Sequence, residues 1–183
     1  MNLRVSSGVL RGRYIKVPDT GLRPTEEKVR SALFNTLFSM IEFENRSFLD
    51  IFSGSGIFAF EALSRGFASS AALELNPKAV SLIKSAADDL GLARQVTVLR
   101  GDAFSFDFAS LDRKFNTIFL DPPYALGEKM PGLLDKIVDS GIVDEVCVIV
   151  VEGNSETLWQ KAGWNSKIKK FGGTYLTVFY NWE

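Results

Sequence analysis

Four consecutive residues, Asp121-Pro122-Pro123-Tyr124, end the apolar run 117–120 and carry the clearest indication of chemistry in the sequence. Each proline fixes its own φ at about −65° and disfavours helical geometry in the residue before it, so the segment forms a small rigid corner. The Asp121 carboxylate and the Pro122 carbonyl can accept hydrogen bonds at one point, and the Tyr124 ring can lie against a planar group there. This corner suits an amine with two N–H donors, such as the exocyclic amine of a nucleobase. A strand-ending turn with a tyrosine in the core is the alternative.

A glycine-rich turn, Asp50-Ile51-Phe52-Ser53-Gly54-Ser55-Gly56, separates a strand-like segment from a helix-like one. Its glycines let the backbone approach a ligand, and the N-terminus of the following helix adds a partial positive field. The turn lacks the third glycine of the dinucleotide fingerprint, because Ala59 stands there, although alanine can serve at that position. Asp50 would repel phosphates but can hold an ammonium group. Tight packing of strand on helix is the structural alternative.

Two further acids end strand-like segments of the chain. Glu74, with Leu75 beside it, can accept hydrogen bonds from ribose hydroxyls, and a solvated strand end is the alternative. Asp102 can hold an adenine amine while the Ala103 N–H meets a ring nitrogen, and a helix N-cap is the alternative for Asp102. Because open α/β sheets bind ligands at the carboxyl ends of their strands, these turns together predict a site for S-adenosylmethionine. Its methyl group and a target amine would meet at Asp121.

The elements that must position these residues follow from hydrophobic periodicity. Residues 2–17 alternate around Gly8 and Gly12 like a short β-hairpin, and the segment 29–41 has helical spacing behind Thr25, a suitable N-cap. Strand-like and helix-like segments then alternate, which predicts a mostly parallel, Rossmann-like α/β sheet of seven strands with an antiparallel C-terminal hairpin turning at Gly172-Gly173. The predicted strands are 47–52, 70–75, 96–100, 117–120, 146–152, 164–171 and 174–180, and the predicted helices are 57–65, 78–90 and 132–140.

Composition narrows the class of protein. The chain has 183 residues, of which 46% are hydrophobic, as expected for one globular domain. We see no apolar run long enough to span a membrane and no apolar leader at the N-terminus. The single cysteine, Cys147, can form no internal disulfide, so we expect a cytoplasmic protein. The absence of histidine excludes histidine bases, Ser–His and Cys–His nucleophiles and histidine-rich metal sites, and no metal is expected.

The distribution of charge is uneven. Residues 1–30 contain seven basic and three acidic side chains, a net charge of +4, and the remainder carries −5. A basic arm on an acidic body can bind the phosphates of a nucleic acid, and an ordinary solvated surface is the alternative.

Several longer motifs resemble one family. The sequence contains Arg4-Val5-Ser6-Ser7-Gly8 with Arg11-Gly12-Arg13, Leu22-Arg23-Pro24-Thr25, the turn 49–56, Glu61-Ala62-Leu63-Ser64-Arg65-Gly66, and the corner 121–124. Between residue 3 and about residue 180 it is similar to the RsmD-type 16S ribosomal RNA guanine-N2 methyltransferases, class I S-adenosylmethionine enzymes with a Rossmann-like fold. Ser53 stands where a small alanine is usual in that family.

The resemblance implies a basic hairpin arm at 1–24 followed by a methyltransferase domain at 25–183. It implies methyl transfer from S-adenosylmethionine to the exocyclic N2 of a guanine in small-subunit ribosomal RNA, in a monomer acting on a small-subunit particle. The residues expected at the reacting amine are Asp121, Pro122 and Tyr124. Those expected at the cofactor are Asp50, Ser53, Gly54, Ser55, Gly56, Glu74, Leu75, Asp102, Ala103 and Asp121, bordered by Arg23 and Thr25. Those expected on RNA phosphates are Arg4, Arg11, Arg13 and Arg23.

Three other functions remain open from the residues. An adenine-N6 methyltransferase would use the same corner at Asp121, and guanine and adenine substrates separate the two. A nicotinamide-dependent oxidoreductase would bind NAD in place of S-adenosylmethionine. An RNA-binding module without activity would bind RNA and neither cofactor.

Overall fold

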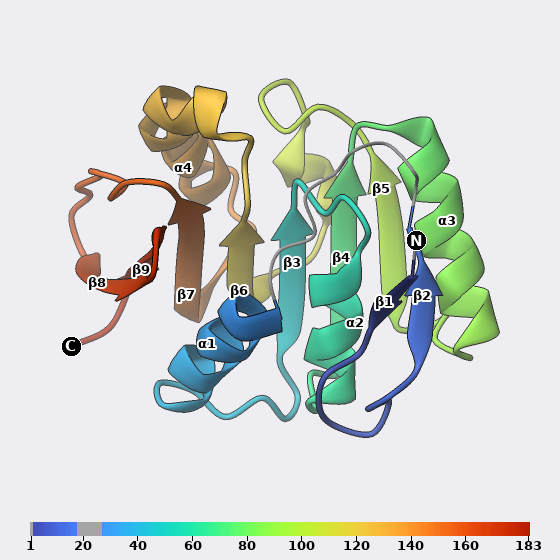
Figure 1. The fold of residues 1–183 in the computed structure, drawn as a ribbon. Coiled ribbons are helices and arrows are strands. Elements are labelled where there is room, and N and C mark those ends of the chain that lie inside the picture. Colours follow the sequence, from blue (N-terminus) through green and yellow to red (C-terminus); the bar gives the residue numbers. More distant parts are fainter. Residues whose placement is uncertain (1, 18–26) are drawn as a thin grey trace.

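The sheet of this protein is mixed, as Figure 1 shows for a computed structural model that describes residues 2–17 and 27–183. Within the described residues, seven strands form one sheet in the order β5-β4-β3-β6-β7-β9-β8. The first five in that order pair in parallel, and β9 pairs antiparallel with both β7 and β8. The predicted Rossmann-like fold with its C-terminal hairpin is confirmed. The strands are β3 (Ser47–Ile51), β4 (Ser69–Glu74), β5 (Val96–Arg100), β6 (Phe115–Leu120), β7 (Val143–Gly153), β8 (Asn165–Phe171) and β9 (Thr174–Tyr180).

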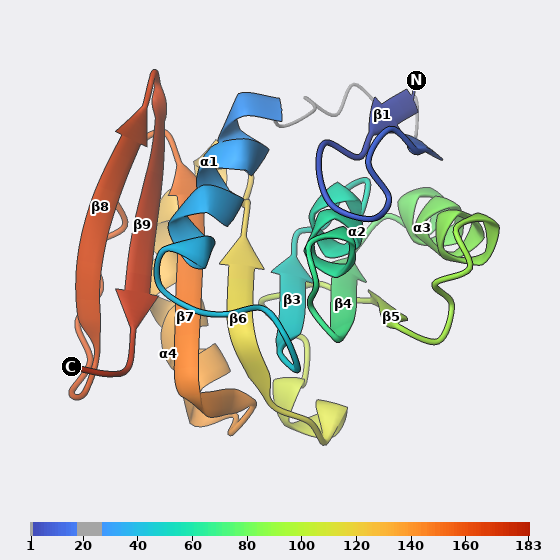
Figure 2. The ribbon, with the colours of Figure 1, turned by 90° about the horizontal axis from the view of Figure 1, so that it is seen from below.

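Helices cover both faces of this sheet. One face carries the helices α1–α3 and the other carries α4 and the short 3-10 helices, as the view from below shows (Figure 2). Because side chains alternate along a strand, Phe48 packs into the core under α1 and α2, while its neighbour Leu49 packs into the core under α4. The helices are α1 (Glu27–Phe38), α2 (Ile57–Ser64), α3 (Pro77–Asp89), α4 (Met130–Asp139), η1 (Phe108–Leu111) and η2 (Tyr124–Lys129).

The N-terminal hairpin, β1 (Asn2–Arg4) paired with β2 (Tyr14–Lys16), forms a separate two-stranded sheet outside α2 and α3 (Figures 1 and 2). Its turn docks on the C-terminal end of α2. The Val9 amide donates to the Ser64 carbonyl at 2.8 Å, and the Leu10 amide donates to the Ser64 hydroxyl at 2.9 Å. Gly8 has φ +79°, and a Cβ there would lie 1.7 Å from the Ser64 carbonyl oxygen. Only glycine fits this close approach of two backbones.

A buried acid holds the same junction from inside. Glu61 of α2 is fully buried, and it accepts a hydrogen bond from the Ser6 amide at 2.6 Å. It forms an ion pair with Arg65 at 3.1 Å and lies 3.7 Å from Arg30 of α1. The motif around Ser6 and Gly8 and the motif from Glu61 to Gly66 are therefore two halves of one junction.

A few predicted boundaries are wrong by several residues. Strand β7 begins at Val143 and not at 146, because the ladder with β6 includes the pair Phe115–Val143 before its register shifts. Helix α4 begins at Met130, two residues earlier than predicted, and η2 has no counterpart in the prediction. The C-terminal turn is as predicted, with Gly172 at φ +60°. The suggested N-cap Thr25 lies outside the described residues.

Candidate active site

The acids singled out in the sequence end adjacent parallel strands. Asp50 on β3 is paired with Ala72 of β4 on one side and with Phe119 of β6 on the other. Glu74 is the last residue of β4, and Asp121 directly follows β6. Since parallel strands end at the same edge of a sheet, the structure brings the turns after β3, β4, β5 and β6 together at one edge.

The glycine-rich turn has left-handed backbone at three positions: Phe52 at φ 65°, Gly54 at 55° and Gly56 at 74°. A phenylalanine at positive φ is strained, and such strain is concentrated at functional sites. At Gly56, a Cβ would lie 3.0 Å from two carbons of Ile83, so glycine lets α3 pack against the start of α2.

Side chains hold this turn in place. The carboxylate of Glu74 accepts hydrogen bonds from the amides of Gly54 and Asn76, each at 2.7 Å. The Ser53 hydroxyl lies 2.8 Å from the Asp50 carbonyl and 3.0 Å from the Leu73 carbonyl. Glu74 therefore fixes the loop with one lone pair of each oxygen and keeps others for a ligand, whereas Ser53 uses its single hydroxyl proton within the turn.

Asp50 is the most buried acid of this edge, with 1% of its surface exposed. Neither carboxylate oxygen has a hydrogen-bond partner among the described side chains and backbone groups. Burial raises the pKa of Asp50 well above its usual range, and the charges of Asp121 and Glu74 raise it further. The nearby Ala59 amide, which does not reach hydrogen-bond geometry, offsets only part of this. A buried carboxyl without a partner is costly, so this position favours a ligand that brings a positive charge.

The turn after β5 forms a further part of the rim. Asp102 is exposed, and one of its carboxylate oxygens accepts a hydrogen bond from the Phe104 amide at 3.1 Å, while Ala103 is buried. This is the capping geometry weighed from the sequence, although it closes a turn and not a regular helix. The Phe104 ring lies 6.0 Å from the Phe52 ring, and Leu75 is 63% exposed near the end of β4. Apolar side chains thus accompany the polar groups.

The corner after β6 has the geometry expected of its prolines. Asp121 is half-buried, and its amide donates to the Ile51 carbonyl at 3.4 Å, which links this corner to the end of β3. Pro122 is buried, while Pro123 is exposed with extended backbone at φ −50° and ψ 133°. Tyr124 begins η2 and is 48% exposed. Its ring is a surface on which a planar ligand can stack, and not a core tyrosine.

The sequence analysis missed one acid of this edge, Glu152. It lies near the end of β7 with 5% of its surface exposed, and its Oε2 is buried with no hydrogen-bond partner in the described structure. Burial, and then the charge of Asp121, raise its pKa from 4.5 to about 8. Its position could have revealed it, because Glu152 directly follows the apolar run 146–151, just as Glu74 ends an earlier strand-like segment.

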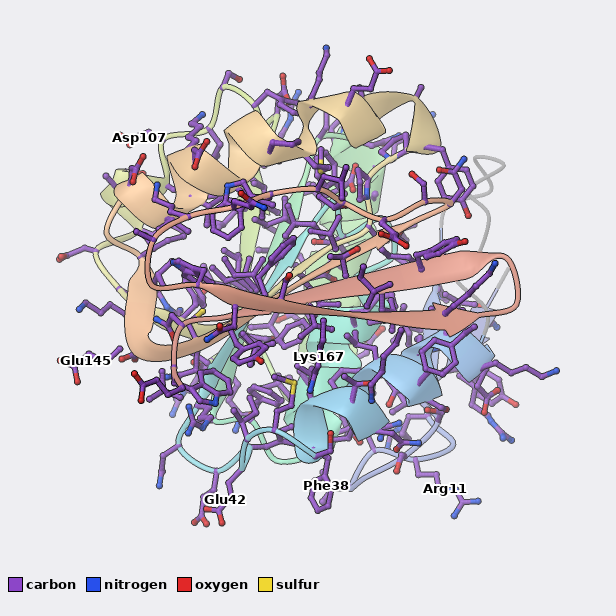
Figure 3. All side chains as sticks on the ribbon, turned by 90° about the vertical axis from the view of Figure 1, so that its left-hand side faces the viewer. Arg11, Phe38, Glu42, Asp107, Glu145 and Lys167 are labelled. Carbon is purple, nitrogen blue, oxygen red and sulfur yellow. The ribbon has the colours of Figure 1, made fainter. Side chains whose placement is uncertain are left out.

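The basic residues predicted to bind RNA lie on the hairpin. Arg4, Arg11 and Arg13 are exposed, and Figure 3 shows Arg11 projecting from the surface of the molecule. Arg4 faces outward with Tyr14, its partner across the hairpin, while the pair Leu3–Ile15 faces the protein. Arg23 and Thr25 lie outside the described residues.

Metal-ligand clusters and membrane-spanning helices are both absent from the part of the chain that the structure describes. Residues 2–17 and 27–183 contain no group of three or more Cys, Asp or Glu side chains arranged to hold a metal ion. Across the same ranges, no helix has the length and apolar character needed to cross a membrane. Cys147 is buried and free, and burial raises the pKa of its thiol.

Comparisons with known proteins match almost the whole chain. The family model described as "Conserved hypothetical protein 95" matches residues 3–180. "Ribosomal RNA small subunit methyltransferase D" of Escherichia coli K12 is 36% identical over 189 residues, which cover 99% of this chain and 90% of that protein. The Bacillus subtilis protein named "Putative rRNA methyltransferase YlbH" is 38% identical over 157 residues, 84% of each chain. The solved structure named "Putative methyltransferase yhhF from Escherichia coli" superposes with a TM-score of 0.83 at 31% identity, over 100% of this chain and 99% of that one.

Proposed function

This chain belongs to the family described as Conserved hypothetical protein 95, and on that premise we propose that it transfers a methyl group from S-adenosylmethionine to the exocyclic N2 of a guanine in small-subunit ribosomal RNA. The resemblance found in the sequence is thereby confirmed at the level of the family. Two relatives named as ribosomal RNA methyltransferases support the coarser activity. The observation that carries the proposal is the meeting of the glycine-rich turn and the Asp121 corner at one sheet edge.

The residues of this edge fit S-adenosylmethionine. Asp50, buried without a partner, supplies the negative charge that the amino-acid part of the cofactor requires. The carboxylate of Glu74 keeps lone pairs for the ribose hydroxyls after accepting two backbone amides. Asp102 and Ala103 face the adenine, while the backbone of Ser53, Gly54, Ser55 and Gly56, with Leu75, forms the wall of the pocket.

Asp121 and the Pro122 carbonyl then act on the target amine. When bound, the cofactor supplies a methyl group on a sulfonium. The two acceptors hold both protons of N2, which favours the pyramidal, cation-like nitrogen of the transition state. They also hold the nitrogen in line for displacement. The exposed ring of Tyr124 stacks on the flipped base.

The basic hairpin binds the RNA backbone. Arg4, Arg11 and Arg13, together with Arg23, contact phosphates, which makes RNA binding sensitive to salt. In this proposal residues 1–24 are the RNA-binding arm and residues 25–183 the methyltransferase domain. The protein acts as a monomer in the cytoplasm, without a metal, on ribosomal RNA within a small-subunit particle.

The test is the identity of the methylated nucleoside. Unmodified small-subunit ribosomal RNA, free and in particles, is incubated with the enzyme and S-adenosylmethionine, digested, and analysed by mass spectrometry. We expect N2-methylguanosine. Because the corner at Asp121 could equally hold the N6 amine of adenine, N6-methyladenosine would replace the proposal by that alternative. Binding of NAD but not of S-adenosylmethionine, measured by calorimetry, would rule out methyl transfer altogether.

A further inference from the structure

Glu152 and Asp121 end adjacent strands and face the same side of the sheet. The preceding residues, Val151 and Leu120, are register partners on β7 and β6, and both pack into the core under α4. Alternation turns Glu152 to the opposite face, which Asp50 also occupies, and the charge of Asp121 acts directly on the Glu152 carboxyl. Two carboxyl groups thus lie side by side where the target amine is proposed to bind.

Glu152 is not a structural acid like the buried Glu61 or the partly buried Glu74. Glu61 is compensated by two arginines and a backbone amide, and Glu74 by two backbone amides. Glu152 has no hydrogen bond or ion pair of this kind within the described structure. Its burial therefore costs stability without any local compensation, which is typical of a group kept for its chemistry.

The charges around Glu152 come from several elements. Asp121 of the β6 end is its acidic neighbour, and across the ladder it meets the apolar Leu176 of β9. Lys169 of β8 lies one strand further along the same row. From the helix layer, Arg30 of α1 is directed to Glu61 and to the Arg4 carbonyl. The described surroundings thus hold Glu152 in a site where a proton binds tightly.

We propose that Glu152 is the proton-accepting partner of Asp121 in the methyl transfer, a deepening that rests on the proposed function. The N2 lone pair forms the bond to the methyl carbon, and the carbon–sulfur bond breaks with its electron pair going to sulfur. The nitrogen then carries one proton too many, which passes to the Asp121 carboxylate and from there to the ionised Glu152. Glu152 releases it to solvent after the product leaves, so the step balances.

This role suits the proton affinity of Glu152. A base is most effective when its pKa lies near the working pH, and the pKa of Glu152 is raised to about 8. An ordinary surface glutamate would bind the proton far more weakly. Because the ionised form must accept the proton, the rate should rise with pH until Glu152 is fully ionised.

The experiment measures single-turnover methyl transfer between pH 6 and 9 with the full chain, S-adenosylmethionine and small-subunit particles. For the natural protein we expect a rate that rises with pH, reaches half of its maximum at about pH 8 and approaches a plateau at the upper end of this range. Glu152→Gln keeps the shape but cannot accept a proton, so its rate should fall by roughly 100-fold and lose this pH dependence. Glu152→Asp should recover part of both. Glu145→Gln, on the same strand but exposed at its far end (Figure 3), should match the natural protein.

A direct titration separates this inference from the proposed function. Side-chain carboxyls labelled with carbon-13 should show one glutamate titrating near pH 8 that is missing in Glu152→Gln, whatever nucleoside is methylated. A natural protein without such a carboxyl overturns the inference, as does a Glu152→Gln variant that keeps the natural pH profile. A product other than N2-methylguanosine would instead overturn the proposed function and leave the titration as the test of the pair.

Discussion

Gly8→Ala should release the N-terminal hairpin from α2. A Cβ at Gly8 would lie 1.7 Å from the Ser64 carbonyl oxygen, and neither backbone can yield without breaking the junction. Four hydrogen bonds depend on this approach: Val9 and Leu10 amides to Ser64, the Ser64 hydroxyl to the Ser7 carbonyl, and the Ser6 amide to Glu61. At about 1 kcal/mol each, their loss lowers the free energy of unfolding by about 4 kcal/mol.

Gly12→Ala is the matched control for this variant. Gly12 also has positive φ, at +88°, but a Cβ there meets no atom within 4 Å. Its replacement therefore costs only the left-handed strain of about 1–2 kcal/mol. Urea unfolding gives both free energies, and hydrogen exchange at the Val9 and Leu10 amides reports local release. The explanation would be refuted if both variants lost the same free energy of unfolding and both amides stayed protected in Gly8→Ala. Glycine would then not be required by the close approach of the Gly8 and Ser64 backbones.

Three further predictions concern charge. Asp50→Asn should raise the stability of the free protein at pH 8 in urea unfolding. Burial raises the pKa of Asp50, so the natural protein loses stability as pH rises above the usual range of an aspartate, where the unfolded chain gives up this proton and the folded protein keeps it. The same variant should weaken S-adenosylmethionine binding by roughly 10- to 100-fold in calorimetry. Glu152→Gln should become progressively more stable than the natural protein as pH rises from 4.5 to about 8, because the folded protein binds the Glu152 proton more tightly than the unfolded chain does. The difference in the free energy of unfolding, measured in urea, is at most about 5 kcal/mol. Arg4→Gln should weaken RNA binding for all sequences and reduce the salt slope of its affinity by about one, whereas an unchanged slope would remove Arg4 from the phosphate contacts.

The fold could be predicted from local patterns because its parallel strands are short apolar runs bounded by polar turns. The segments that became β4, α3 and β9 were predicted to within one or two residues. Boundaries failed where the chain departs from that rule. The acidic Asp144 and Glu145, half-buried and exposed, interrupt the apolar pattern of the first part of β7. The 3-10 helix at Tyr124 has no periodicity by which to predict it.

Four acids of the candidate site could be placed at one sheet edge from the sequence because each lies at or next to a strand end, and strand ends meet at one edge in a parallel sheet. Glu152 was missed, although it also lies near a strand end. What the sequence could not reveal were contacts between distant segments. The hydrogen bond between Ser6 and Glu61 joins residues 55 positions apart. The pairing of Glu152 with Asp121 likewise depends on the strand order, which places β7 next to β6. Long-range neighbours of this kind follow from topology and register, not from periodicity.

The central claim is that the carboxylate of Asp121 lies beside the transferred methyl group, and Asp121→Ala tests it most directly. We expect methyl transfer to small-subunit ribosomal RNA to fall below detection, while the dissociation constant of S-adenosylmethionine stays within about threefold, since Asp50 and Glu74 remain in place. Asp89→Ala, on the exposed side of α3, is the control and should transfer at the natural rate. Transfer at the natural rate by Asp121→Ala would contradict the account.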